Sequence, residues 1–174
     1  MSILRGKAHR YGDNVDTDVI IPARYCTSIR VEDLAPHCLE DLDTHFVKKV
    51  RKGDFIVAGR NFGCGSSREV APIAIRGAGV SCVIAAGFAR IFYRNAINIG
   101  LPILESPEAY DGIKDGDEIE ADLATGVIRD LTLGREFRAA SFEGVMLEII
   151  NLGGMEAYVR KRLAEKKSKE ASRG

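Results

Sequence analysis

The sequence has no long hydrophobic run and no excess of charge of either sign. No apolar stretch approaches the roughly 18 residues of a membrane-spanning helix, and residues 1–6 lack the continuous apolar segment of a signal peptide. The 25 basic and 25 acidic residues give a net charge of zero, which does not indicate a nucleic-acid or membrane partner. We therefore expect a soluble, cytoplasmic protein that binds neither nucleic acid nor membranes.

Cysteine and histidine are scarce, and their spacing is unlike that of a metal site. The four cysteines, Cys26, Cys38, Cys64 and Cys82, form no C-x-x-C pair, and the three histidines form no triad or ligand pair. This pattern does not indicate a zinc site or an iron–sulfur cluster held by this chain alone. We predict four reduced thiols with structural roles and no metal bound by this chain.

The composition is that of an ordinary folded domain. Apolar residues make up 45% and charged residues 29% of the 174 positions, which predicts a single domain spanning residues 1–174. A chain of this length buries enough surface to fold without a disulfide or metal. The segment from about residue 155 onwards is predicted to be a basic C-terminal helix with a solvated tail, because residues 160–174 hold seven basic and two acidic side chains.

Short apolar runs alternate with helical patterns, which predicts a mixed α/β fold. The expected strands are residues 19–21, 55–58, 82–85 and 101–104, followed by a β-hairpin over 116–133 and a strand over 145–150. The expected helices are residues 69–78, 88–99 and 155–166. The middle two of the first four strands are apolar enough to be buried on both faces.

The most informative segment is residues 59–69 (GRNFGCGSSRE), between an expected buried strand and an expected helix. Gly63 and Gly65 allow a tight turn and a close approach to a ligand, and the helix that follows would offer unpaired N–H groups. The segment fails both the Walker A pattern and the dinucleotide fingerprint. Because Arg68 can bind a carboxylate through two parallel donors, the predicted ligand is a carboxylate or a phosphate.

Two other uses of this segment remain open. In the first, Ser66 or Ser67 serves as a helix cap and has no other role, and Arg68 is a surface residue. Ser66 can also take part in proton transfer, although no base is evident beside it, so the helper group is expected from another chain.

A second polar cluster occupies residues 12–22 (GDNVDTDVIIP) and places three acidic residues ahead of an apolar run. It lacks the glycine and the distal glutamate of a calcium loop. Asx-type turns and caps are the alternative use of these side chains.

Three strings carry a resemblance to a known family: residues 12–22, residues 61–69 (NFGCGSSRE) and residues 88–95 (FARIFYRN). Together they resemble the small subunits of the 3-isopropylmalate dehydratase family, which are equivalent to the swivelling domain of aconitase. The resemblance covers almost the whole chain. One departure is Val70, where family members usually carry histidine. The resemblance implies an α/β fold of three layers, β/β/α, of the aconitase swivel type.

The resemblance also implies an activity: a hydro-lyase subunit of leucine biosynthesis that interconverts 2-isopropylmalate and 3-isopropylmalate by dehydration and rehydration. In this family a separate large subunit holds a [4Fe-4S] cluster whose open iron acts as a Lewis acid. Carried over by position, Ser66 is the catalytic proton-transfer residue. Ser67, Arg68 and Gly65 bind the substrate, a small dicarboxylate, and Asp18 is a supporting residue.

Thr27 is the residue that the resemblance ties to substrate choice. Relatives that process homoaconitate carry an arginine at this place, whereas Thr27 is uncharged and would favour an apolar side group. Arg30 lies three residues further on and is expected to be solvated. Two other hypotheses stay open, namely the same architecture acting on homoaconitate, dimethylmalate or citraconate, and a non-catalytic module that binds an anionic metabolite.

Overall fold

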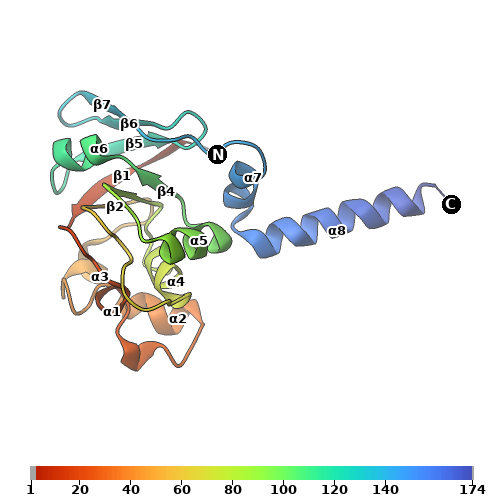
Figure 1. The fold of residues 1–174 in the computed structure, drawn as a ribbon, viewed down its shortest axis with the longest axis horizontal. Coiled ribbons are helices and arrows are strands. Elements are labelled where there is room, and N and C mark those ends of the chain that lie inside the picture. Colours follow the sequence, from red (N-terminus) through yellow and green to blue (C-terminus); the bar gives the residue numbers. More distant parts are fainter. Residues whose placement is uncertain (1–2, 174) are drawn as a thin grey trace.

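The computed structural model describes residues 3–173, which contain a seven-stranded mixed sheet in the order β4-β3-β2-β1-β5-β6-β7 (Figure 1). Strands β1 to β4 are parallel, and β5 to β7 are antiparallel to their neighbours. The strands are β1 (Ile3–Arg10), β2 (Phe55–Ala58), β3 (Cys82–Ala85), β4 (Ile103–Glu105), β5 (Glu118–Asp122), β6 (Val127–Asp130) and β7 (Arg135–Arg138).

Strand β1 joins the two halves of the sheet. Its residues 8–10 pair in parallel with β2, and its residues 3–7 pair antiparallel with β5. Strands β2 and β3 are buried at every position, as their continuous apolar runs predicted. The centre of the core therefore lies at the parallel half of the sheet.

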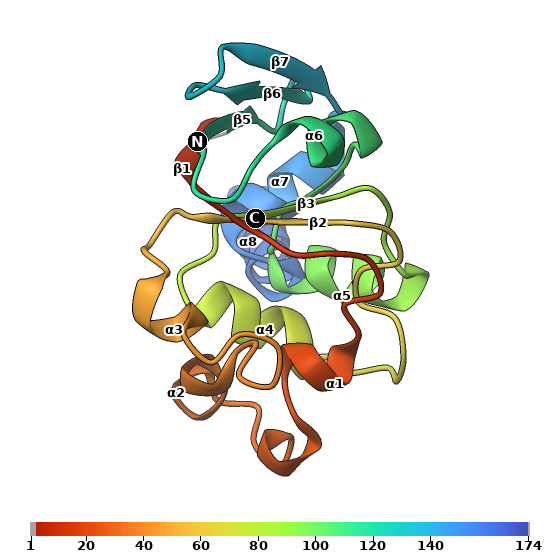
Figure 2. The ribbon, with the colours of Figure 1, turned by 90° about the vertical axis from the view of Figure 1, so that its left-hand side faces the viewer.

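The helices within residues 17–99 cover one face of the parallel strands, and the antiparallel strands lie on the other side together with the helix of residues 107–112 (Figure 2). This is the α/β arrangement of three layers, β/β/α, that the resemblance implied. The helices are α1 (Thr17–Ile20), α2 (Val31–Leu34), α3 (Phe46–Lys49), α4 (Val70–Gly77), α5 (Arg90–Ile99), α6 (Pro107–Gly112), α7 (Gly144–Leu152) and α8 (Met155–Ala171), with 3-10 turns at Ala23–Tyr25 and Ala35–His37.

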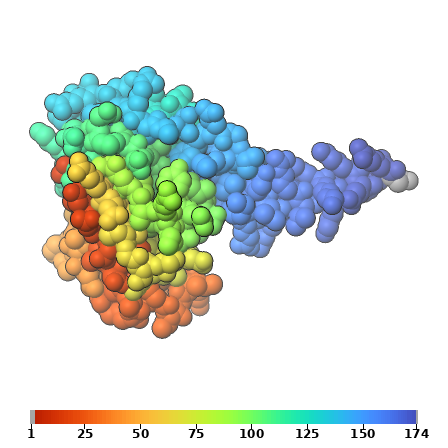
Figure 3. All heavy atoms as spheres, in the orientation of Figure 1, coloured from red at the N-terminus to blue at the C-terminus, as the bar shows by residue number. Residues whose placement is uncertain are grey.

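Most of the predicted elements are confirmed. The strands over 55–58 and 82–85, the helices that became α4 and α5, and the hairpin that became β5 and β6 are all present. The basic C-terminal helix is also present as α8, which has no buried residue and projects from the body of the molecule (Figure 3).

Two strand predictions are wrong. Residues 19–21 fall in or next to α1, because the Asp16 side chain accepts a hydrogen bond from the Val19 N–H at 2.9 Å and caps a helical turn. Residues 145–150 lie in α7, which ends at Gly153 in the left-handed region with a φ of 89°. β-branched side chains favour strands only weakly, so these local caps decide the conformation.

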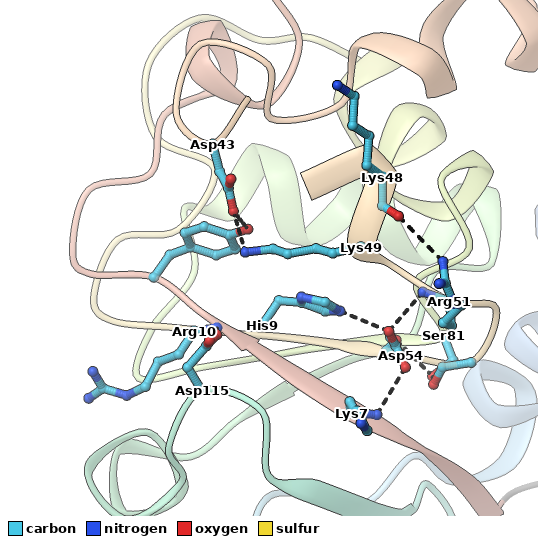
Figure 4. A network of polar contacts seen from close by, with 12 residues as sticks. Lys7, His9, Arg10, Asp43, Lys48, Lys49, Arg51, Asp54, Ser81 and Asp115 are labelled. Carbon is cyan, nitrogen blue, oxygen red and sulfur yellow. Dashed lines mark hydrogen bonds and ion pairs between the residues drawn. The ribbon is translucent and has the colours of Figure 1, made fainter. Parts of the chain in front are cut away.

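The buried carboxylate of Asp54 links the start of strand β2 to strand β1 (Figure 4). Asp54, just before β2, accepts hydrogen bonds from the backbone N–H groups of Lys7 and Arg51 and interacts with His9 Nε2 at 2.8 Å. Burial opposes ionisation, but these hydrogen bonds outweigh it and hold the pKa of Asp54 below its ordinary value of 3.8.

We expect Asp54→Asn to lower the free energy of unfolding by about 3 kcal/mol at pH 7, because an amide nitrogen would then face N–H donors. A lowered pKa stabilises the fold above pH 3.8 and loses that effect as the pH falls through the folded value. Urea unfolding between pH 3 and 7 measures the free energy of unfolding and its dependence on pH. At the acidic end, this free energy should fall less steeply with decreasing pH in Asp54→Asn than in the wild type. The matched control, Glu136→Gln on the exposed strand β7, should change stability by less than about 0.5 kcal/mol. Equal effects of the two variants would contradict this account.

Candidate active site

The loop of residues 59–69 leaves β2 and enters α4. Three of its residues adopt the left-handed conformation, with φ values of 59° at Asn61, 79° at Gly63 and 89° at Gly65. Gly63 is required for packing as well, since a Cβ there would lie 2.2 Å from Cγ of Phe92. The tight turning predicted from the two glycines is therefore present.

Two other segments hold this loop. The N–H of Gly63 donates to the Val15 carbonyl at 2.8 Å, and Thr17 donates from its hydroxyl to the Ser66 carbonyl at 2.8 Å. On the opposite side, Phe62 forms an isolated parallel bridge with Phe88. The three strings that carried the family resemblance thus meet at one place in the fold.

A cavity of about 360 Å³ lies where the loop meets the beginning of α5. Three of the predicted site residues, Gly65, Ser66 and Arg68, line it. The other lining residues are Thr17, Asn61, Gly63, Ala89, Arg90, Ile91, Phe92 and Asn95. Ser67, Asp18 and Thr27 are not among the residues that line it.

The cavity is rich in hydrogen-bond donors. The backbone N–H groups of residues 65–68 donate no hydrogen bond within residues 3–173. The amino end of α5 lines the cavity, whereas α4 begins at Val70 and none of its residues is in the lining. The residue before α4 is Glu69, and no side chain caps the helix, so neither Ser66 nor Ser67 acts as a cap. Free N–H groups from a loop and a helix end favour an anionic ligand.

Arg68 is positioned by residues from the first segment. Its guanidinium donates to the Ile21 carbonyl at 2.9 Å, contacts Cys26 Sγ at 3.4 Å and pairs with the Asp18 carboxylate. The Arg68 side chain is 16% exposed and that of Asp18 is 60% exposed. The structure therefore brings together two predicted site residues, Arg68 and Asp18, that lie 50 positions apart in the sequence.

Ser66 is exposed, and its hydroxyl has no hydrogen-bond partner within residues 3–173. The histidines lie elsewhere: His9 pairs with Asp54, His37 pairs with Glu40, and His45 does not line the cavity. The described part of the chain thus places no imidazole beside Ser66.

Thr27 is exposed and directly follows Cys26, the residue whose sulfur contacts Arg68. Arg30 is exposed and pairs with Glu32 at 3.1 Å. Val70, the departure from the family pattern, is buried in the first turn of α4. Thr27 therefore lies next to a residue that contacts the Arg68 guanidinium, and it does not line the cavity.

The acidic residues near the site have structural partners. Asp13 accepts from the Arg60 N–H at 2.7 Å, and Asp16 caps α1. Within residues 3–173 no group of three His, Cys, Asp or Glu side chains is arranged to hold a metal ion. All four cysteines are free thiols, and burial raises the pKa of Cys38 and Cys82.

None of the helices within residues 3–173 is both long enough and apolar enough to cross a bilayer.

Sequence reasoning missed four cavity residues with polar side chains. Thr17 is buried and holds the loop, and Asn61 adopts a positive φ at the cavity wall. Arg90 and Asn95 lie on α5, which the sequence predicted as a helix and as part of a family string, but neither residue was assigned to the site. An arginine at the first position of a helix, where cations are unfavourable, was the available signal.

Comparisons with known proteins agree with this geometry. Residues 11–109 match the model of the aconitase C-terminal domain. The chain is 63% identical over 161 residues to a 3-isopropylmalate dehydratase small subunit from Caldicellulosiruptor bescii, covering 92% of this chain and 97% of that one. It is 58% identical over 160 residues to that of Caldanaerobacter subterraneus, covering 92% and 99%.

The crystal structure of a 3-isopropylmalate dehydratase from Methanocaldococcus jannaschii superposes on this chain with a TM-score of 0.90 at 47% identity, covering 96% of this chain and 99% of that one. The strands, helices and loop described above are thus those of a known enzyme family. On both sequence and structure, the chain belongs to the family of 3-isopropylmalate dehydratase small subunits.

Proposed function

We propose that the loop of residues 59–69 is this chain's half of an active site that a large subunit completes. The chain is the small subunit of an aconitase-type hydro-lyase of leucine biosynthesis. The observation that carries the proposal is the cavity, which Ser66 and Arg68 line and beside which the backbone N–H groups of residues 65–68 donate no hydrogen bond within residues 3–173. These groups suit a dicarboxylate whose carbon-bound proton must be removed and returned.

Each residue has a role that follows from its position. Ser66 takes the proton from carbon during dehydration and returns it during rehydration, and the N–H groups of residues 65–68 stabilise negative charge on its oxygen. Arg68, Ser67 and the backbone at Gly65 bind a carboxylate of the substrate. Asp18 is a supporting residue because it pairs with Arg68 and fixes the direction of the guanidinium.

The aconitase family uses a [4Fe-4S] cluster, which acts as a Lewis acid on the substrate hydroxyl. The cysteines of this chain do not fit such a group, because Cys38 and Cys82 are fully buried and no three metal-ligating side chains gather within residues 3–173. We therefore place the cluster on the large subunit. Free thiols at all four cysteines fit a reducing compartment, and we place the enzyme in the cytoplasm.

Anaerobic coexpression with a cluster-bearing large subunit tests this function. The reconstituted enzyme should interconvert 2-isopropylmalate and 3-isopropylmalate faster than other 2-hydroxy diacids in a panel, and the isolated chain should be inactive. Turnover by the isolated chain would contradict the division of the site between two subunits. A reconstituted enzyme that prefers dimethylmalate or citraconate would favour the related-acid alternative.

Thr27→Arg should shift the substrate preference of the reconstituted enzyme towards homoaconitate. Thr27 directly follows Cys26, whose sulfur contacts Arg68, and an uncharged Thr27 leaves a third carboxylate without a partner, at a desolvation cost of several kcal/mol. Specificity constants for isopropylmalate and homoaconitate measure the change. Thr27→Ser is the matched control and should keep the wild-type preference, whereas an unchanged ratio in Thr27→Arg would remove Thr27 from substrate choice.

Arg68→Lys should raise the Michaelis constant by at least about tenfold. Lysine keeps the charge but cannot contact the Ile21 carbonyl, Asp18 and a substrate carboxylate together. Steady-state kinetics of the reconstituted variant give the value, and Arg60→Lys, on the same loop but outside the cavity lining, is the control. A Michaelis constant within twofold of wild type would show that Arg68 only fastens the loop.

A further inference from the structure

The charges around the cavity are unevenly partnered. Arg68 and Arg90 are the two charged side chains among the residues that line it. Arg68 already pairs with Asp18, so together they add no net charge. Arg90 is exposed, and no hydrogen bond or ion pair joins it to another residue within 3–173. A substrate with two carboxylates would thus meet Arg68, whose charge is balanced by Asp18, and Arg90, whose charge is not balanced by a described residue.

The position of Arg90 is locally unfavourable. It is the first residue of α5, at the positive end of the helix dipole, where acidic side chains are preferred. The first turn of α5 contains no acidic residue that could balance this charge. An arrangement that concentrates positive charge without local compensation is typical of a functional site.

Asn95 adds a second, independent observation. Its Nδ2 group is buried and has no hydrogen-bond acceptor within residues 3–173, and the residue lines the same cavity. Buried donors are almost always paired in native proteins, so an unpaired one beside a cavity indicates a missing acceptor. A carboxylate or hydroxyl oxygen of a bound ligand would supply it.

We propose that Arg90 and Asn95 are further substrate-binding residues, which bind the carboxylate that Arg68 does not hold. This inference rests on the proposed function, because it assumes the same dicarboxylate in the same cavity. Arg90 contributes the charge that balances the second carboxylate, together with the free N–H groups at the start of α5. Asn95 donates from the side of the cavity formed by α5. The substrate is then held between the loop and α5, with Ser66 on the loop side.

Kinetics of the reconstituted heteromer test the proposal. Arg90→Gln should raise the Michaelis constant by at least about tenfold and leave kcat within about threefold of wild type. The inhibition constant of a saturated dicarboxylate without the hydroxyl should rise by the same factor, which a merely structural role would not produce. Arg94→Gln removes the same charge from the same helix outside this cavity and should change neither constant by more than about twofold.

Two further variants keep the test decisive. Arg90→Lys retains the charge and should still raise the Michaelis constant, so the proposal remains testable if Arg90→Gln fails to fold. Asn95→Leu removes an unpaired donor at similar volume, so it should leave the melting temperature unchanged or higher while raising the Michaelis constant at least about fivefold.

The outcomes separate this inference from the function on which it rests. An active wild type with unchanged constants in Arg90→Gln and Asn95→Leu overturns the inference alone. Weaker subunit assembly with an unchanged Michaelis constant in the fully assembled enzyme also overturns it, since Arg90 would then be a subunit contact. A wild-type heteromer without activity on any dicarboxylate of the panel overturns both.

Discussion

Replacement of Ser66 by alanine should lower kcat of the reconstituted enzyme by at least about a hundredfold, the scale expected when a positioned proton-transfer group is removed. Ser66 lines the cavity, its hydroxyl has no hydrogen-bond partner within residues 3–173, and the free N–H groups of residues 65–68 favour negative charge nearby. Subunit assembly and the melting temperature should stay near wild type, because Ser66 is exposed and contacts Thr17 only through its backbone carbonyl.

Ser67→Ala is the informative comparison because it removes the same hydroxyl one position away. Ser67 does not line the cavity, and its proposed role is to bind a carboxylate, so its loss should raise the Michaelis constant more than it lowers kcat. Stopped-flow or steady-state assays of both variants under anaerobic conditions provide the comparison. A Ser66→Ala enzyme with near-normal kcat would show that another group moves the proton.

The parallel half of the sheet could be predicted because its strands carry their own signal. Residues 55–58 and 82–85 are continuous apolar runs, which strands buried on both faces require. Residues 145–150 have a similar composition but form a helix, because Gly153 in the left-handed conformation ends a helical segment there. Strand β1 was not predicted, because five of its first seven residues are exposed or only partly buried and its sequence contains no continuous apolar run.

The loop at the site was predictable, whereas its partners were not. From local sequence alone, Gly63 and Gly65 predict a tight turn, and Arg68 predicts an anionic ligand. The helix end that faces the loop is positioned by the bridge between Phe62 and Phe88, which connects the segments that follow β2 and β3. Contacts of this kind depend on the tertiary fold and leave no local pattern.

Replacement of Gly63 by alanine should lower the free energy of unfolding by at least about 3 kcal/mol and abolish activity. The left-handed φ of 79° is strained for any residue with a Cβ, and the new methyl group would overlap the Phe92 ring, with a Cβ to Cγ distance of 2.2 Å. Phe92 is 2% exposed and contacts Phe62 edge-to-face, so the ring has no free space to enter.

Gly65→Ala separates backbone strain from steric overlap. Gly65 has a φ of 89°, but the nearest atom to a Cβ there is Asp16 Cβ at an ordinary distance of 3.5 Å. Strain alone should lower stability by about 1–2 kcal/mol, clearly less than at Gly63. Urea unfolding of both variants measures the difference. Equal losses of stability in the two variants would mean that the Phe92 ring moves aside freely. In that case the packing between the loop and α5 would not hold the cavity between Ser66 and the helix end rigid.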